Sequence, residues 1–215
     1  KLPVPEAEYE NVVLKPSEFQ KEMVESLADR AEAVRDRRVD ASVDNMLKIT
    51  SDGRKVSYTQ RMIDPTLPYE PESKIFKAAE NIIKEYKDSA DIKGTQIVFL
   101  DMATPKGTDK TKADTDTNTN TTDDGYDEES ARLYDDMRDY LVKKGIPKRE
   151  IAFIHEADSD AKRKQLFEDV NNGKVRVLIG STGKMGVGMN AQKRIVAIHH
   201  LDAPWRPGDV EQRNG

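Results

Sequence analysis

The 215-residue sequence has no cysteine, only three histidines and no long hydrophobic run. The lack of cysteine excludes disulfide bonds, cysteine-ligated zinc, iron–sulfur clusters and thiol nucleophiles. With so few histidines, we expect no metal site. No apolar stretch approaches the roughly 18 residues that cross a membrane, and the first ten residues lack the apolar core of a signal peptide. We therefore expect a soluble cytoplasmic protein without a membrane partner.

Positive charge is also in deficit, since 35 basic side chains face 40 acidic ones and the net charge is −5. The deficit is uneven along the chain. Residues 108–136 hold ten acidic and three basic side chains, whereas residues 137–215 carry a net charge of +5. The start of the acidic segment has almost no apolar residues to offset the entropy cost of ordering it. We therefore predict a flexible acidic insertion at residues 108–130.

Residues 1–72 show helical periodicity and no clear strand. Ser17 and Gln20 have the spacing of a capping box at the start of one helix. A second helical stretch covers about residues 42–63, with an interruption predicted near Asp52 and Gly53. Prolines at positions 65, 68 and 71 then indicate a linker. We therefore divide the chain into a helical segment, 1–72, and a second domain, 73–215.

From residue 73 onwards, amphipathic helices alternate with short apolar runs. These runs cover residues 95–101, 151–155, 175–180 and 195–201. Runs of this kind are typical of parallel strands that are buried on both faces. The pattern predicts a three-layer α/β domain with a mainly parallel sheet of at least four strands. Ligands of such sheets bind at the carboxyl ends of the strands, here Asp101-Met102, His155-Glu156, Gly180 to Thr182, and Asp202.

The segment 177–192, VLIGSTGKMGVGMNAQ, places four glycines, two hydroxyls and Lys184 after a predicted strand. Such a loop can present backbone N–H groups to phosphate, although a tight strand-to-helix turn would use the same glycines. It is not a mononucleotide P-loop, because no GK[ST] occurs. Gly186, Gly188 and Ala191 fit the dinucleotide pattern G-x-G-x-x-A. However, only about three residues separate Ala191 from the next predicted strand, too few for the crossover helix of that motif.

The segment 199–215, HHLDAPWRPGDVEQRNG, is the other stretch with candidate functional residues. Asp202 ends a predicted strand, and a rigid turn follows at residues 205–207. The single tryptophan, Trp205, would serve equally as a packing residue, and the two histidines favour core or strand-surface positions. Gln212 and Arg213 are predicted to open a helix that the sequence cuts off.

These stretches resemble motifs IV, V and VI of superfamily 2 helicases, especially the Swi/Snf-like group. IVFLD, residues 97–101, corresponds to motif IV. The motif V pattern S-T-x-A-G-G-x-G-x-N-L is matched by Ser181, Thr182, Gly186, Gly188 and Asn190, and departed from at Lys184, Met185 and Ala191. Motif VI is matched by Asp202, Trp205, Pro207 and Gln212, with Arg206 in place of an asparagine.

The resemblance covers roughly residues 73–215, and residues 45–65 match the helical segment that precedes the second lobe. The sequence of residues 192–215 is most similar to the helicase part of helicase–DNA methyltransferase proteins of bacterial mobile elements. The resemblance therefore implies a bacterial cytoplasmic protein whose residues 1–72 lie between two motor lobes. It implies that residues 73–215 form the second, RecA-like lobe of a DNA-dependent ATPase.

In that family, ATP binds between the two lobes and DNA crosses both. The resemblance implies DNA-backbone contacts at Asp101, Met102, Ser181, Thr182 and Lys184. It implies an ATP cleft that includes Gly186, Gly188, Asn190, Asp202, Gln212 and Arg213.

The Walker motifs of the first lobe do not occur in this sequence, and the two finger arginines of motif VI would follow Gly215. The catalytic set is therefore incomplete, and we expect ATP and Mg²⁺ to bind only in a complete two-lobe protein. The implied partners are DNA, an N-terminal RecA-like lobe and a fused DNA methyltransferase. The replacement of Ala-Gly by Lys184-Met185 keeps an alternative open, a non-catalytic module that binds nucleic acid or protein.

Overall fold

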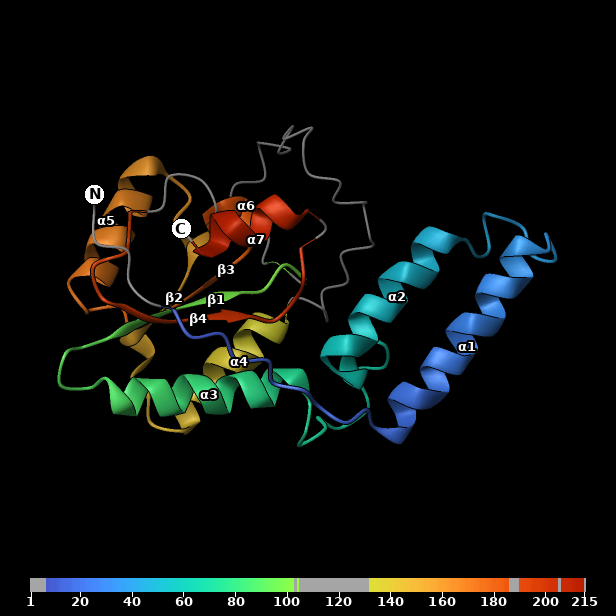
Figure 1. The fold of residues 1–215 in the computed structure, drawn as a ribbon, viewed down its shortest axis with the longest axis horizontal. Coiled ribbons are helices and arrows are strands. Elements are labelled where there is room, and N and C mark those ends of the chain that lie inside the picture. Colours follow the sequence, from blue (N-terminus) through green and yellow to red (C-terminus); the bar gives the residue numbers. More distant parts are fainter. Residues whose placement is uncertain (1–6, 103, 105–131, 186–189, 205, 215) are drawn as a thin grey trace.

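The computed structural model describes residues 7–102, 104, 132–185, 190–204 and 206–214, which form a helical hairpin and an α/β lobe (Figure 1). The predicted acidic insertion lies outside the described residues. None of the described helices is both long and apolar enough to span a membrane. The helices are α1 Glu18–Arg35, α2 Met46–Tyr58, α3 Lys74–Asp88, α4 Arg132–Lys143, α5 Asp160–Asn171, α6 Thr182–Met185 and α7 Pro207–Asn214. The strands are β1 Thr95–Phe99, β2 Ile151–Phe153, β3 Val177–Gly180 and β4 Ile195–His200.

Helices α1 and α2 form the hairpin, which stands beside the α/β lobe in Figure 1. The capping box at the start of α1 is confirmed: Ser17 Oγ accepts a hydrogen bond from the Gln20 amide, and the Gln20 side chain accepts one from the Ser17 amide. The predicted interruption of the second helix is wrong, because α2 runs without a break through Gly53. Gly53 faces Leu27 of α1, so packing between the two helices offsets the low helix propensity of glycine.

The sheet has the strand order β2-β3-β1-β4, and every neighbouring pair is parallel. Strands β1 and β3 are buried along their whole length, while the edge strand β4 is only partly buried. The predicted parallel four-stranded sheet is confirmed. Since all strands run in the same direction, their carboxyl ends meet at one edge of the sheet.

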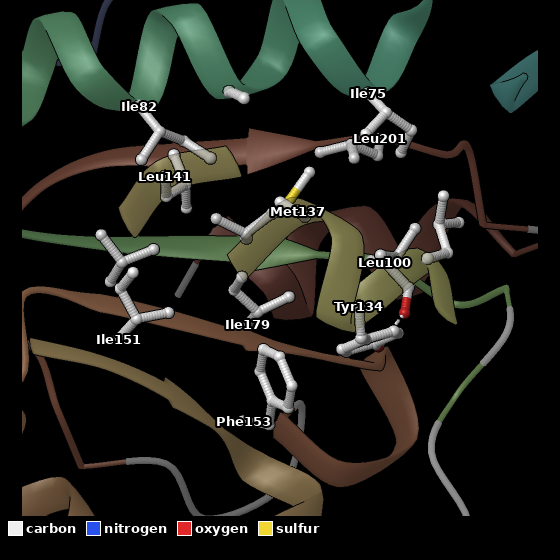
Figure 2. Packing of buried hydrophobic residues seen from close by; sticks show 14 of the residues in the cluster. Ile75, Ile82, Leu100, Tyr134, Met137, Leu141, Ile151, Phe153, Ile179 and Leu201 are labelled. Atoms are coloured by element: carbon white, nitrogen blue, oxygen red, sulfur yellow. Dashed lines mark hydrogen bonds between the residues drawn. The ribbon is translucent and has the colours of Figure 1, made fainter. Parts of the chain in front are cut away.

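Helices cover both faces of this sheet and make three layers. On one face, α3 and α4 pack on the strands, and Figure 2 shows their side chains meeting those of the sheet. This cluster includes Ile75, Ile82, Met137, Leu141, Ile151, Phe153 and Ile179. On the other face, α5 contributes Phe167 and Val170, which pack against Ile97, Phe99 and Leu178. Side chains alternate along β1: Val98 belongs to the first cluster, and Ile97 and Phe99 belong to the second. One strand therefore contributes to both cores.

Two predicted boundaries are corrected at the carboxyl edge. Strand β2 ends at Phe153, and a 3-10 turn over Ile154–Glu156 follows it. Gln212 and Arg213 lie in the last turn of α7 and do not open it, so that prediction is wrong. Helix α7 begins at Pro207, whose fixed φ and missing N–H suit the first helical position. Because the helix starts earlier, Arg213 lies six residues, or nearly two turns, after its first residue. This position brings the Arg213 side chain to the strand ends.

Candidate functional site at the carboxyl edge of the sheet

Arg213 of α7 lies at the centre of the carboxyl edge, and its side chain is completely buried. Its Nη2 donates hydrogen bonds to Asp101 Oδ2 at 2.8 Å and to Asp202 Oδ1 at 2.7 Å. Its Nε donates to Thr182 Oγ1 at 2.8 Å, and its Nη1 donates to the Asp202 carbonyl oxygen at 2.9 Å. One guanidinium therefore joins residues that follow β1, β3 and β4.

Asp101, Thr182 and Asp202 are also bonded to one another. The Thr182 amide donates to Asp101 Oδ1 at 2.6 Å, and the Thr182 hydroxyl donates to the same carboxylate at 2.8–2.9 Å. The Asp101 amide donates to Asp202 Oδ2 at 2.7 Å. We call Asp101, Thr182, Asp202 and Arg213 the strand-end network. The Thr182 hydroxyl also accepts from Arg213 Nη2 at 2.6 Å, in addition to Nε. It therefore donates once and accepts twice, and its bonding capacity is used up within the network.

The strand-end network has two carboxylates and one guanidinium, and buried charges are costly unless they are paired and hydrogen-bonded. Tyr58 of α2 supplies a further donor, since its hydroxyl lies 2.5 Å from Asp202 Oδ2. Burial and the nearby Asp202 carboxylate raise the pKa of Tyr58, so the hydroxyl keeps its proton. Lys74 Nζ lies 4.9 Å from the Tyr58 ring centroid. Burial lowers the pKa of Lys74, and Asp202 partly opposes that shift.

Two rings complete the surroundings of Arg213. The guanidinium carbon lies 4.9 Å from the centroid of the Phe99 ring, and His200 stacks on the same ring with centroids 5.6 Å apart. Burial lowers the pKa of His200, which favours the neutral ring. A neutral ring fits both of its contacts: Nδ1 accepts from Arg213 Nη1 at 3.3 Å, and Nε2 donates to Asn214 Oδ1 at 3.0 Å.

Residues 126–215 match the helicase conserved C-terminal domain family. This part of the chain is similar to the C-terminal lobe of superfamily 1 and 2 helicases. No curated protein matches the chain significantly. The helicase-like part includes Thr182, Asp202 and Arg213, whereas Asp101 and Tyr58 precede it. The parallel four-stranded sheet between two helical layers is the RecA-like α/β fold that the sequence predicted.

The other predicted site residues lie outside the strand-end network. The Met102 side chain is buried in the core beside Leu100 and Leu133, so only its backbone remains for a ligand. Ser181 is half-buried, and Lys184 is exposed on α6. The carbonyl of Asn190 accepts a hydrogen bond from Asn171 of α5 at 2.6 Å, which holds Asn190 beside that helix. Gln212 is exposed on α7, and Gly186 and Gly188 lie outside the described residues.

His155 follows β2 at the same edge of the helicase-like part. Neither of its buried ring nitrogens has a hydrogen-bond partner in the described structure. Burial, with a smaller contribution from the charge of Lys184, lowers the pKa of His155 to about 4. The ring is therefore neutral at pH 7. The described residues include no group of three or more histidine, aspartate or glutamate side chains that could hold a metal ion.

Sequence reasoning missed Tyr58, Phe99 and His200 as parts of the site. Tyr58 is 144 residues from its partner Asp202, and no local pattern connects two such positions. The sequence pattern around Phe99 predicts only a buried strand residue, and Phe99 is indeed buried in β1. His200 lies two residues before Asp202 at a predicted strand end, and this position was the one available signal.

Proposed function

We propose that this chain is the second motor lobe of an ATP-dependent DNA helicase or translocase of the Swi/Snf-like group. The observation that carries the proposal is the strand-end network. It joins Asp101, Thr182, Asp202 and Arg213 at the edge where ligands of parallel sheets bind. Three of the four residues belong to the helicase-like part. A grouping at this edge suits a lobe that must couple a bound ligand to the position of its strands.

We propose that DNA contacts this edge through its phosphates. Lys184 is exposed and lies two residues beyond Thr182, and Ser181 directly follows β3. The Asp101 amide and the amide and hydroxyl of Thr182 all donate within the network. We propose that these two residues maintain the shape of the edge. Met102 would contribute its backbone. Contacts of this kind do not depend on base sequence and weaken with salt.

For the ATP side, we propose that Gly186, Gly188, Asn190, Asp202, Gln212 and Arg213 border a cleft with another lobe. ATP with Mg²⁺ would supply the phosphoryl-transfer chemistry when bound there. Arg213 directs its N–H groups to partners inside the lobe, so it shapes the cleft. The described residues include no group of three or more potential metal ligands, and we propose that the residues for Mg²⁺ belong to an N-terminal RecA-like lobe. A fused DNA methyltransferase is a further proposed partner.

Binding of labelled oligonucleotides tests the DNA contact. We expect the chain to bind two 30-nucleotide strands of unrelated sequence with equal Kd, and to bind more weakly as NaCl rises from 50 to 200 mM. Lys184→Ala should weaken binding to both strands and reduce the salt slope by about one. Lys84→Ala is the matched control, because Lys84 is exposed on α3 and paired with Asp88. It should bind like the wild type in fluorescence anisotropy.

Two results would contradict this proposal. Failure of the wild-type chain to bind either strand at 50 mM NaCl would refute the DNA contact and favour a protein-interaction module. DNA-stimulated ATP hydrolysis by the pure chain would refute the assignment as an incomplete second lobe.

A further inference from the structure

Tyr58 belongs to the helical hairpin by sequence, yet its hydroxyl enters the strand-end network. We propose that Tyr58 is a positioning residue for this network, so that the shape of the edge depends on how α2 docks against the lobe. The inference rests on the proposed function in one respect, namely that the edge binds DNA. It adds a coupling between the helical segment and the site.

Packing fixes where the Tyr58 hydroxyl lies. Tyr58 ends α2, is 1% exposed, and belongs to the same core cluster as Ile75, Leu100 and Leu201. Immediately after it, Glu70 accepts hydrogen bonds from the Thr59 hydroxyl and the Gln60 amide, both at 2.7 Å. Core packing of Tyr58 therefore holds the end of α2 on the lobe, and Glu70 ties that end to the segment that precedes α3. Movement of α2 away from the lobe would withdraw the hydroxyl from Asp202.

The bonds of Asp202 show what withdrawal would change. Its side chain is 7% exposed. Oδ1 accepts from Arg213, and Oδ2 accepts from Tyr58 and from the Asp101 amide. Without Tyr58, Oδ2 keeps one described donor while the carboxylate stays buried. Because Arg213 Nη2 is shared between Asp202 and Asp101, its shift toward Asp202 would loosen Asp101 and, through it, Thr182.

A pair of tyrosine variants tests this coupling. Tyr58→Phe removes the hydroxyl and keeps the ring. Tyr86→Phe is the matched control, since the Tyr86 hydroxyl also donates to a carboxylate, Glu150 Oε2, at 2.7 Å but lies outside the network. The hydrogen-exchange rates of the Asp101 and Thr182 amides, measured by NMR, report directly on the network, because both amides donate to its carboxylates.

We expect Tyr58→Phe to speed exchange of both amides about tenfold, the size of a lost hydrogen bond to a charged group. It should also weaken binding of a 30-nucleotide strand about threefold or more, while Tyr86→Phe leaves both measurements near wild type. Equal exchange in the two variants would overturn the inference. Faster exchange with unchanged DNA affinity would overturn the link to DNA.

A measurement on the wild-type chain covers the case in which Tyr58→Phe does not fold. Exchange in low urea should show the α2 amides opening together with the Asp101 amide, as one cooperative unit. An opening that exposes α2 and leaves Asp101 protected would overturn the inference. If the wild type binds no DNA, the proposed function fails, and exchange still decides whether Tyr58 positions the network.

Discussion

Two arginines in this molecule each bind two aspartates, one in the helical hairpin and one in the lobe. Arg30 of α1 makes a two-bond contact with Asp44, at 2.6 and 2.9 Å, and one bond with Asp52 at 2.9 Å. The Arg30 side chain is 26% exposed, whereas that of Arg213 is 0% exposed. The residue types are the same and the surroundings differ.

The difference shows that location decides the role of an arginine with two aspartates. Arg30 joins two helices of the hairpin, whereas Arg213 joins strand ends at a candidate site. Arg30 joins positions 14 and 22 residues away within the hairpin, where water and salt reach the pair. Arg213 joins the ends of three strands, including Asp101 at 112 residues' distance. In the lobe, the Asp202 side chain is 7% exposed and that of Asp101 is 23% exposed. Loss of Arg213 would therefore leave above all Asp202 without water or a counterion. The two clusters should therefore respond very differently to the same substitution.

The largest effect is expected for Arg213→Met. The substitution leaves the Asp101 and Asp202 carboxylates close together at the strand ends without their cation. Breaking a buried ion pair in this way costs about 3–5 kcal/mol of stability. Urea denaturation followed by circular dichroism measures the free energy of unfolding.

A charge-neutral variant separates the two causes of that loss. Adding Asp101→Asn and Asp202→Asn to Arg213→Met removes the uncompensated charges, so part of the stability should return. If Arg213→Met alone lowered the free energy of unfolding by less than about 1 kcal/mol, the carboxylates would have to be in contact with water, and the network would not be buried.

The same contrast explains how much the sequence could predict. The four strands, the parallel sheet and the capping box at Ser17 follow from local patterns of apolar and polar residues, and all are confirmed. Since parallel strands end at one edge, Asp101, Thr182 and Asp202 could be expected near one another. The placement of Arg213 could not, because it depends on α7 starting at Pro207. The contact of Tyr58 with Asp202 could not be predicted for a similar reason, since it depends on how α2 packs on the lobe.

The roles of the candidate residues in binding DNA or ATP remain predictions. Hydrogen bonds within the lobe explain why Thr182, Asp202 and Arg213 lie together.

An intermediate effect is expected from pH. Between pH 7.5 and 5.5, where histidines titrate, it should come from the lobe, because all three histidines belong to it. Burial lowers the pKa of His199 to about 4, below the roughly 6.5 of an unfolded chain. The unfolded state therefore takes up a proton that the folded state does not, and stability falls as pH drops below 6.5. Between pH 7.5 and 5.5, His199 alone should cost about 1 kcal/mol.

The control for this prediction is His199→Gln. Glutamine keeps an amide donor for Gln96 Oε1, which His199 Nε2 contacts at 2.8 Å. In urea titrations at several pH values, the variant should lose about 1 kcal/mol less than the wild type over the same range. Identical pH profiles would mean that His199 is solvated in the folded lobe.

The smallest effect is expected for Arg30→Met. Its ion pairs are partly exposed, and such pairs contribute below about 1 kcal/mol, less as salt rises. The loss of stability should therefore shrink between 0.05 and 0.5 M NaCl, whereas the loss for Arg213→Met should stay nearly constant. Arg38→Met serves as the control, because Arg38 pairs with Asp36 on the open surface and its removal should change nothing measurable. A salt-independent loss for Arg30→Met would remove the distinction, since both arginines would then act as buried partners.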